Sequence, residues 1–256
     1  MFTGTHCLKS NFNLSELDSM GKSAPMYLQL RQQLVDWIRE KNLTSQDKLP
    51  AERILASKFT TTRVTLRQAL AQLEAEGVIF RSNRRGWFVT PDRLSYDPSK
   101  DIGFNVYVQQ QGSIPRTETI SKELILAPRW LADKSGLEVN TPIFHFVRRR
   151  YVDERALLIE HNYINPEGCA GLMALNTDDS LWQLLRDQYS LQPASRNIEM
   201  YPQALVDDTA DLLGVNTGSA GLYLQRISYD DVGRFLEFDH EYWLHDALKL
   251  VVNVKG

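Results

Sequence analysis

Cysteine, membrane-length apolar runs and catalytic motifs are all scarce in this chain. Its two cysteines, Cys7 and Cys169, lie far apart and match no metal-ligand or redox spacing, which favours free thiols over the alternative of one disulfide. No apolar run approaches the ~20 residues that span a membrane. Residues 1–23 lack the basic start and apolar core of a signal peptide. We therefore expect a cytoplasmic protein without a membrane partner.

Patterns of common catalytic and metal sites are missing as well. The sequence has no nucleophile–base motif, no cluster with metal-ligand spacing and no phosphate-binding glycine loop. Its five histidines are scattered, and a metal pair of His240 and His245 is far less favoured than two unrelated histidines. The expectation is that the protein has no catalytic residue, metal or cofactor and is not an enzyme.

Charge is distributed unevenly along the 256 residues, a length that suits two domains. The net charge is −3, but residues 22–93 hold 13 Lys and Arg against 7 Asp and Glu, a net of +6 that leaves −9 for the remainder. A basic first third on an acidic body is typical of a DNA-binding head joined to a domain that does not bind DNA. Chance clustering of solvated charge is the alternative.

Residues 24–91 have the pattern of a winged helix-turn-helix, whereas residues 1–23 have no period and are expected to form a flexible tail. A first helix opens at Pro25, where the missing N–H is harmless. A second helix is expected over residues 51–59. The residues predicted to face inward from this second helix are Ile54, Leu55 and Phe59.

A third helix, from Thr62 as N-cap to Gly77 just past its end, is the candidate recognition helix. Its apolar stripe at helical spacing is Leu66, Ala69, Leu70 and Leu73. The opposite face is small and polar, so the backbone could approach a DNA groove while Arg67 and Gln68 read base edges. A plain solvent-facing surface is the alternative.

A basic hairpin follows this helix. Residues 78–81 and 87–90 are expected to be strands, and the turn between them contains Arg84, Arg85 and Gly86. Two arginines and a glycine at a hairpin tip suit a wing that lies on phosphates or in the minor groove. Directly after a helix-turn-helix, a wing is a more specific interpretation than a solvated turn.

The segments LPAERILA (49–56), TRVTLRQAL (62–70), EG (76–77) and RGWFV (85–89) closely resemble the DNA-binding domain of the GntR family of bacterial repressors. The resemblance covers about 65 residues. It implies DNA contacts by Arg53, Thr62, Arg63, Thr65 and Arg67, and by Arg85 and Gly86 in the wing. Gln68 and Arg84 join these candidates, while Glu52 is expected to be structural.

Two residues depart from the family pattern. Thr60 stands in the helix–helix turn where glycine is usual, and because threonine tolerates positive φ poorly, the turn is expected to differ locally. Trp87 stands where the wing usually has Thr or Ser. It is expected to pack on the base of the wing rather than to meet a sugar.

After a polar linker predicted at 92–101, strands and helices alternate over residues 102–256. The predicted strands are 117–126, 143–151, 157–163, 196–204, 221–229, 235–243 and 248–254, and the predicted helices are 128–135, 180–189 and 207–213. The hairpin at 143–163 and the hairpin at 221–243 echo each other, since each follows a short helix and a Val-Asn-Thr sequence. We infer a pseudo-two-fold domain with both hairpins in one antiparallel sheet, closed by residues 248–254.

This second domain resembles the UTRA effector-binding domain, which defines the HutC branch of the GntR family and has a chorismate-lyase-like fold. The expected fold class is therefore α+β, an N-terminal winged helix-turn-helix followed by an α+β antiparallel-sheet effector-binding domain. The resemblance implies a small-molecule effector. An enzyme joined to a DNA-binding head is a less favoured alternative, because a scaffold alone does not exclude one.

Arg148 and Arg150 alternate onto one face of a predicted strand, with Arg149 on the other. Two guanidinium forks on one face suit a phosphate, phosphonate or carboxylate, with an exposed salt-bridged strand as the alternative. The resemblance matches ligand-binding positions to Arg148, Arg150 and Glu160, with Trp182 and Glu237 on neighbouring elements.

The last hairpin adds a second candidate group. Glu237, Asp239, Glu241 and Trp243 alternate onto one face, where acid beside an aromatic ring can hold an ammonium group. A solvated strand face is an equally weighted alternative, although Trp243 is kept as a candidate ligand residue. Secondary candidates for the pocket are Ser113, Arg196 and Tyr201.

Residues 84–91 and 241–246 look like those of UTRA regulators associated with phosphonate utilisation. The implied effector is a small phosphonate such as 2-aminoethylphosphonate, with a sugar phosphate or a histidine catabolite as alternatives. One small helix-turn-helix binds DNA modestly, so a homodimer on a palindromic operator is expected. The predicted function is repression of a catabolic operon that is relieved when the effector binds.

Overall fold

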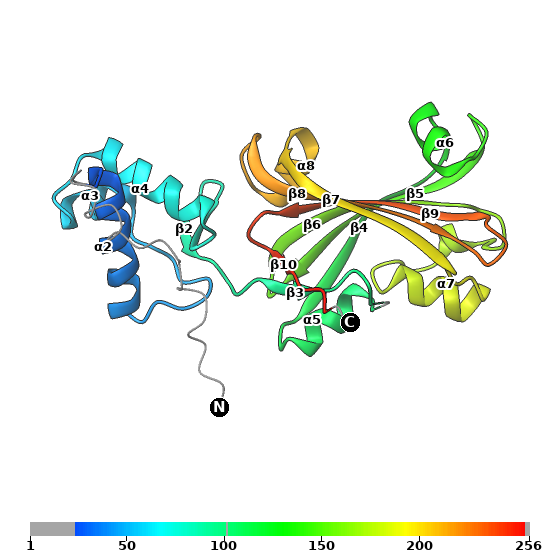
Figure 1. The fold of residues 1–256 in the computed structure, drawn as a ribbon, viewed down its shortest axis with the longest axis horizontal. Coiled ribbons are helices and arrows are strands. Elements are labelled where there is room, and N and C mark those ends of the chain that lie inside the picture. The colour runs from blue at the N-terminus through cyan, green and yellow to red at the C-terminus, as the bar shows by residue number, and fades with distance from the viewer. Residues whose placement is uncertain (1–23, 101, 254–256) are drawn as a thin grey trace. The chain divides into compact units, whose positions relative to one another are not determined.

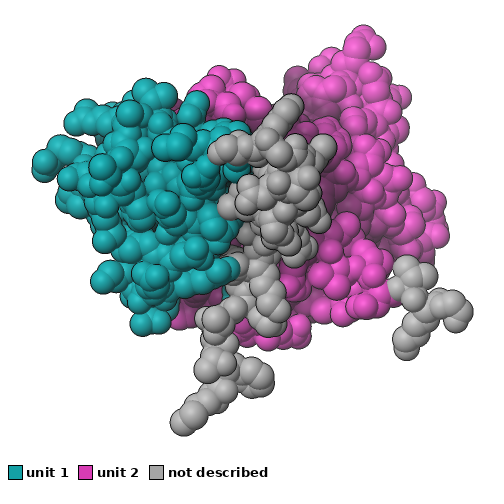
Figure 2. All heavy atoms as spheres, turned by 60° about the vertical axis from the view of Figure 1, so that its left-hand side comes forward, with its two compact units in different colours: residues 1–93 teal, residues 94–256 magenta. Residues whose placement is uncertain are grey.

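The computed structural model describes residues 24–100 and 102–253. The predicted tail at residues 1–23, Cys7 and the ends of the predicted linker and last strand (101 and 254) lie outside the described residues. The chain divides into two compact units between Arg93 and Leu94, coloured separately in Figure 2. None of the described helices combines the length and the apolar character needed to cross a bilayer.

Residues 24–93, the described part of the first unit, form three helices and a two-stranded wing, which can be followed in Figure 1. Its elements are α2 (Met26–Glu40), α3 (Glu52–Lys58), α4 (Arg63–Ala75), β1 (Ile79–Ser82) and β2 (Gly86–Val89). Helix α4 begins as predicted, because Oγ1 of Thr62 accepts a hydrogen bond of 3.1 Å from the N–H of Thr65. The predicted apolar stripe of α4 is fully buried in the core of this unit.

The inward face predicted for α3 is partly wrong. Leu55 is fully buried and Phe59 is half-buried, but 51% of Ile54 is exposed. Successive helical residues are rotated by about 100°, so a helix of 7 residues that buries Leu55 and Ala56 turns Ile54 to solvent. The turn after α3 does not avoid the positive φ that threonine tolerates poorly, contrary to the expectation, since Thr60 has a φ of +48°.

The second unit contains a six-stranded antiparallel sheet of order β4-β5-β6-β9-β8-β7. Its strands are β4 (Pro115–Leu126), β5 (Pro142–Val152), β6 (Arg155–Ile164), β7 (Ser195–Leu205), β8 (Ser219–Tyr229) and β9 (Phe235–Leu244). The first three strands mirror the last three about the central β6–β9 pair. This order confirms the pseudo-two-fold arrangement predicted from the hairpin echo.

Helices lie on both faces of the sheet (Figure 1). Helices α6 (Arg129–Ser135) and α8 (Asp207–Leu213) occupy equivalent places, after β4 and after β7, and stand on one face. Helices α5 (Phe104–Gln110) and α7 (Leu181–Tyr189) lie on the other face, and a short 3-10 turn, η1 (Leu172–Ala174), precedes α7. Helix α5 was not predicted, because it has neither a side-chain N-cap nor an acidic residue in its first turn, and two of its 7 residues, Val106 and Val108, favour strands.

Two expectations about the ends of this unit are wrong. Part of the predicted linker at 92–101 is a strand, β3 (Leu94–Tyr96), and it pairs in parallel with β10 (Leu248–Leu250). The C-terminal segment therefore forms a separate two-stranded sheet instead of closing the main one. The two strands lie at opposite ends of the unit's sequence, and each is too short to show an alternating pattern. Neither strand was therefore visible in the sequence.

Candidate effector pocket and nucleic-acid interface

A pocket with a volume of about 370 Å³ lies between the main sheet and helices α5 and α7. Its floor consists of side chains that alternate onto one sheet face, namely Arg148, Arg150, Leu158, Glu160, Asn162, Arg226, Asp239, Glu241 and Trp243. The strand register sets their neighbours, since Glu160 lies opposite both Arg148 and Glu241, and Asn162 lies opposite Asp239. The two halves of the pseudo-symmetric sheet thus both contribute to one charged floor.

Glu160 is the centre of the first charged group on this floor. Its two oxygens accept hydrogen bonds of 2.8 Å each from Nε and Nη2 of Arg150, and Nη2 of Arg148 forms an ion pair with it. Burial opposes ionisation of Glu160, but the two guanidinium groups outweigh burial and hold its pKa below the usual range. Arg148 also donates to Asn162 and to the carbonyl oxygens of Thr177 and Asp179.

Arg226 is the centre of the second charged group. Its Nη2 donates to Glu241 at 2.9 Å and to the hydroxyl of Tyr96 at 3.0 Å, and its Nη1 lies 3.9 Å from Asp239. Nε1 of Trp243 donates to the other oxygen of Glu241 at 2.7 Å. Arg226 was not predicted, although it lies on β8, the strand equivalent to β5, and the hairpin echo could have indicated it.

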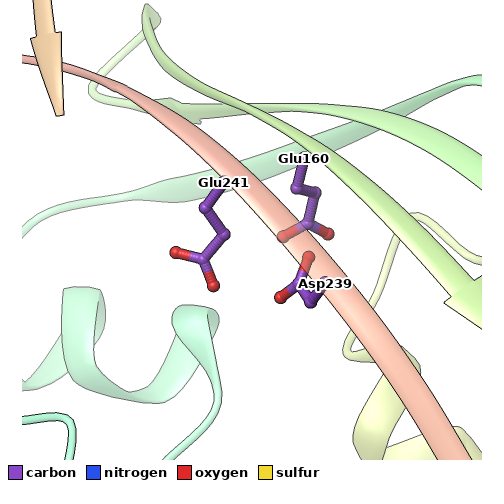
Figure 3. A group of neighbouring side chains, drawn as sticks. All are labelled: Glu160, Asp239 and Glu241. Atoms are coloured by element: carbon purple, nitrogen blue, oxygen red, sulfur yellow. The ribbon is translucent and has the colours of Figure 1, made fainter. Parts of the chain in front are cut away.

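Three carboxylates converge on this floor, as Figure 3 shows for Glu160, Asp239 and Glu241. One oxygen from each lies within 4.8 Å of the others, which is close enough to share a metal ion. Two of the three are already paired with arginine, however, and guanidinium charge on the same floor opposes a divalent cation. Burial raises the pKa of Asp239 well above its usual range, and the neighbouring carboxylates raise it further.

The structure brings the predicted ligand residues to one place. Five of them line the pocket, namely Arg148, Arg150, Glu160, Trp182 and Trp243. Glu237 is buried beside them on the same face of β9 and accepts a hydrogen bond of 3.0 Å from Nδ2 of Asn162. The alternative of a solvated strand face is wrong for this hairpin, because Glu237, Asp239, Glu241 and Trp243 are at most 5% exposed.

Of the three secondary candidates for the pocket, Arg196 lines it and the other two do not. Ser113 donates instead to Asp153, and Tyr201 lies on the opposite face of the sheet against Tyr223. Arg149 also lies on that opposite face and donates to Glu118 at 2.7 Å, as its alternation with Arg148 predicted.

Three of the five histidines gather on the face opposite the pocket, contrary to the expectation that they are scattered. Nε2 of His145 lies 3.2 Å from Nδ1 of His161, and His240 pairs with His161 across the central strands. Burial lowers the pKa of His161 to about 4 and that of His240 to about 3. The pair considered from the sequence is not formed, because His240 points into this cluster whereas His245 follows the end of β9.

The predicted DNA contacts lie on three elements of the first unit. Arg53 is on α3, Thr62 is the N-cap of α4, and Arg63, Thr65, Arg67 and Gln68 are on α4. Arg84 and Arg85 are in the wing turn, and Gly86 begins β2. All nine are exposed or half-buried. Gly86 has a φ of +105°, a backbone conformation that side chains with a Cβ rarely adopt.

Glu52 joins these three elements. Its Oε2 accepts a hydrogen bond of 2.9 Å from Nε of Arg67 on α4, and its Oε1 accepts one of 3.2 Å from Nε1 of Trp87 in the wing. The bond from Arg67, followed by the bond from Trp87, lowers the pKa of Glu52 against the effect of burial. Trp87 is only 7% exposed, so it packs at the base of the wing, and Glu52 has the structural position that the sequence predicted.

A winged helix-turn-helix joined to a domain with an enclosed, charged pocket defines a transcription regulator. Residues 26–89 match the gntR family of bacterial regulatory proteins, and residues 110–249 match the UTRA domain. The chain therefore belongs to the GntR family of bacterial regulatory proteins and carries a UTRA domain.

Curated relatives and solved structures agree with this assignment. The chain is 28% identical over 225 residues to the uncharacterized HTH-type transcriptional regulator YihL of Escherichia coli K12, which covers 88% of this chain and 95% of that protein. It is 28% identical over 214 residues to the HTH-type transcriptional repressor NagR of Bacillus subtilis, and the match covers 83% of this chain and 88% of that protein. The fold is similar to PhnF from Mycobacterium smegmatis, with a TM-score of 0.62 and 21% identity over 88% of this chain and 100% of that one.

Proposed function

We propose that this protein is a repressor that binds a palindromic operator as a homodimer and releases it when a small effector occupies the UTRA pocket. The observation that carries the proposal is the combination, in one chain, of an exposed polar face on α4 and a charged pocket of about 370 Å³. Repression is supported by the similarity to NagR, which is named a repressor. Because the proposed target is chromosomal DNA, we place the protein in the cytoplasm.

Helix α4 and the wing are proposed to contact DNA together. Arg67 and Gln68 are suited to base edges in the major groove, and Val64, which is 69% exposed, offers an apolar contact for a thymine methyl group. Arg84 and Arg85 at the wing turn are suited to phosphates or to the minor groove. Glu52 holds helix α4 and the wing in a fixed relation through Arg67 and Trp87.

The effector is proposed to be a small anionic metabolite, with a phosphonate favoured over a sugar phosphate or carboxylate. Its anionic group is proposed to contact the basic residues that line the pocket away from the floor, Lys100, Arg186 and Arg196. The Trp182 side chain supports the binding of a ligand with a hydrogen-bond acceptor at this place, because its Nε1 is a buried donor with no acceptor among the described residues. Arg148 and Arg150 cannot serve as free forks for the anion, since both already bind Glu160.

An enzyme that carries a DNA-binding head is the second candidate function. No histidine or cysteine is among the described residues that line the pocket, and the hydroxyl of Ser180 caps α7 by accepting from the N–H of Gln183. Glu160 and Glu241 are buried in ion pairs rather than presented to a substrate. These features support a binding role, so we propose that the protein is not an enzyme, a proposal that turnover of a bound ligand would contradict.

The proposed function is tested by selecting genomic DNA fragments with the purified full chain and titrating the enriched fragment by fluorescence anisotropy. The expected result is an inverted repeat bound with a stoichiometry of two chains. Addition of 2-aminoethylphosphonate, inorganic phosphate or a sugar phosphate in separate titrations then identifies which ligand lowers the affinity. Failure to enrich any sequence over bulk DNA would contradict the regulator assignment.

A further inference from the structure

We infer that the deep end of the pocket binds a positively charged hydrogen-bond donor of the effector, such as a primary ammonium group, at Asp239, Glu237 and Ser228. This inference rests on the proposed effector-binding function and deepens it. It names the chemistry of the end of the effector that contacts the acidic residues of the sheet.

Four carboxylates on this sheet face are buried, and three guanidinium groups of the central strands lie among them. The carboxylates are Glu160, Glu237, Asp239 and Glu241, and the guanidinium groups are Arg148, Arg150 and Arg226. A fourth arginine, Arg196 on the edge strand β7, faces the same side opposite Ser228 but is only half-buried. All four acids are at most 5% exposed, so water cannot neutralise the excess negative charge. A cation from the effector would balance it.

The arginines of the floor cannot turn toward an anion without leaving a buried acid unpaired. Arg148 and Arg150 share Glu160, and Arg148 is also bound to two backbone carbonyl oxygens and to Asn162. Arg226 is held by Glu241 and by the hydroxyl of Tyr96. Breaking one of these buried pairs would leave an uncompensated charge in the interior, which costs more than a single new contact to an anion would recover.

Acceptors, in contrast, are left over at the deep end. Oε2 of Glu237 and Oγ of Ser228 are buried and have no hydrogen-bond partner among the described residues. These two residues are 1% and 0% exposed and lie directly opposite each other on β9 and β8. Asp239, two residues along β9, has its nearest guanidinium nitrogen at 3.9 Å, beyond hydrogen-bonding distance.

A single amide links the two underused acids. Nδ2 of Asn162 donates at 3.0 Å to both Glu237 and Asp239, so the two carboxylates are held side by side. Asp239 itself lines the pocket and is therefore the entry point to this group. Buried donors and acceptors are normally satisfied in native structures, and an ammonium group offers three donors to the carboxylates and the hydroxyl here.

Proton linkage supports this placement. Burial raises the pKa of Glu237 to about 7 and that of Asp239 well above its usual range, so the excess negative charge is partly neutralised by protons near neutral pH. A bound ammonium group would lower both pKa values and displace a proton. Binding of an aminated ligand at pH 7 should therefore release protons to the buffer.

The test uses matched ligand pairs that differ only in the amine: 2-aminoethylphosphonate against ethylphosphonate, β-alanine against propionate, and glucosamine 6-phosphate against glucose 6-phosphate. Each is titrated calorimetrically into the full chain at pH 7 in two buffers of different ionisation enthalpy. The expected result is that the aminated member of at least one pair binds at least tenfold tighter and releases a proton. Equal affinity within every pair, including no binding by either member, overturns the inference.

Glu237→Gln and the matched control Glu199→Gln, an exposed residue on the opposite face of β7, complete the test. Glu237→Gln keeps the acceptor for Asn162 and removes the excess charge, so it should raise the melting temperature of the ligand-free chain and weaken the aminated ligand at least tenfold. The control should change neither. A lower melting temperature with unchanged ligand affinity contradicts the inference, and a titration of 1 mM MgCl2 or CaCl2 that reproduces the binding heat assigns the group to a metal instead.

Operator binding by the same preparations separates the two proposals. If the chain binds its operator and one of the anionic ligands releases it, but the amine makes no difference, only the inference about the deep end fails. If no operator is bound, the regulatory function fails irrespective of the ligand result.

Discussion

Arg67 on the exposed face of α4 donates through Nε to Oε2 of Glu52 on α3 at 2.9 Å. The side chain of Arg67 is 68% exposed, so this ion pair adds little stability by itself. Its effect is geometric, because it limits the rotamers of the Arg67 side chain and so fixes the direction of a group that is proposed to read a base. The free nitrogen atoms Nη1 and Nη2 are those that a bidentate contact to guanine requires.

Arg67→Ala is expected to weaken binding to the specific operator by about 1–3 kcal/mol, because it removes a bidentate base contact. Binding to unrelated DNA should weaken much less. Fluorescence anisotropy with operator and scrambled duplexes measures both, and Arg39→Ala on α2 is the control for loss of one positive charge in the same unit. Equal weakening by the two variants would assign Arg67 to nonspecific attraction.

Trp87→Phe should separate the wing from Glu52 while keeping an aromatic ring in the core. The variant loses the hydrogen bond from Nε1 to Glu52, so the free energy of unfolding should fall by about 1 kcal/mol. The ratio of operator to nonspecific affinity should also fall, since the wing and α4 lose a shared anchor. Urea denaturation and the anisotropy assay measure the two effects, and a stable variant with unchanged specificity would show that the anchor is dispensable.

Thr60→Gly is expected to stabilise the first unit by about 1 kcal/mol, because a left-handed backbone costs a residue with a Cβ about 1–2 kcal/mol. Thr60 has a φ of +48° in the turn before α4. Thr61→Gly is the matched control, since Thr61 is outside the set of residues with positive φ and its replacement should destabilise the unit. Denaturant midpoints rank the three proteins, and destabilisation by both glycines would refute strain at Thr60.

Glu160→Gln should destabilise the second unit by about 3–5 kcal/mol, because two buried guanidinium groups lose their shared counter-charge. Glu154→Gln at an exposed surface ion pair is the control, with an expected change below about 1 kcal/mol. Thermal unfolding of the ligand-free chain measures both. A small effect at Glu160 would mean that a neighbouring carboxylate takes its place.

The histidine cluster predicts a specific dependence on pH. Since burial lowers the pKa of His240 to about 3, its neutral form contributes stability that is complete above the unfolded pKa near 6.5 and is lost as pH falls toward 3. His240→Gln should therefore lose less stability than the wild type between pH 6.5 and 4. Glu237 acts in the opposite sense, because its raised pKa favours the folded state at lower pH, so the difference between variant and wild type is the informative quantity.

The parallel measurement on His245→Gln, outside the cluster, should reproduce the wild-type pH dependence. Identical pH profiles for His240→Gln and the wild type would mean that His240 is solvated in the folded protein.

Local and repeated patterns were predictable from the sequence, and long-range pairings were not. The stripe on α4 predicted its buried face, and the echo between two hairpins predicted a pseudo-symmetric sheet, because both signals repeat along the chain. The pairing of β3 with β10 left no such signal, since each strand contributes three residues. The exposure of Ile54 was also missed, because α3 is so short that its sequence does not define which of its apolar residues face inward.

The candidate site shows the same division. Alternation placed Arg148 and Arg150 on one face, but it could not show that both bind Glu160, because that pairing depends on the register of β5 against β6. Arg226 and Tyr96 join the floor only because β8 and β3 are brought there by the fold. The residue types of the pocket were therefore predictable, whereas the partners that determine its free donors and acceptors were not.

Coupling between the pocket and DNA is measured as the affinity of the full chain for its labelled operator with and without 2-aminoethylphosphonate, at concentrations where calorimetry shows the pocket to be occupied. We expect at least a tenfold loss of operator affinity, and no loss in Asp239→Asn, whose pocket should no longer hold the ligand. An operator affinity that stays constant while the pocket is occupied would contradict the coupling between pocket and DNA.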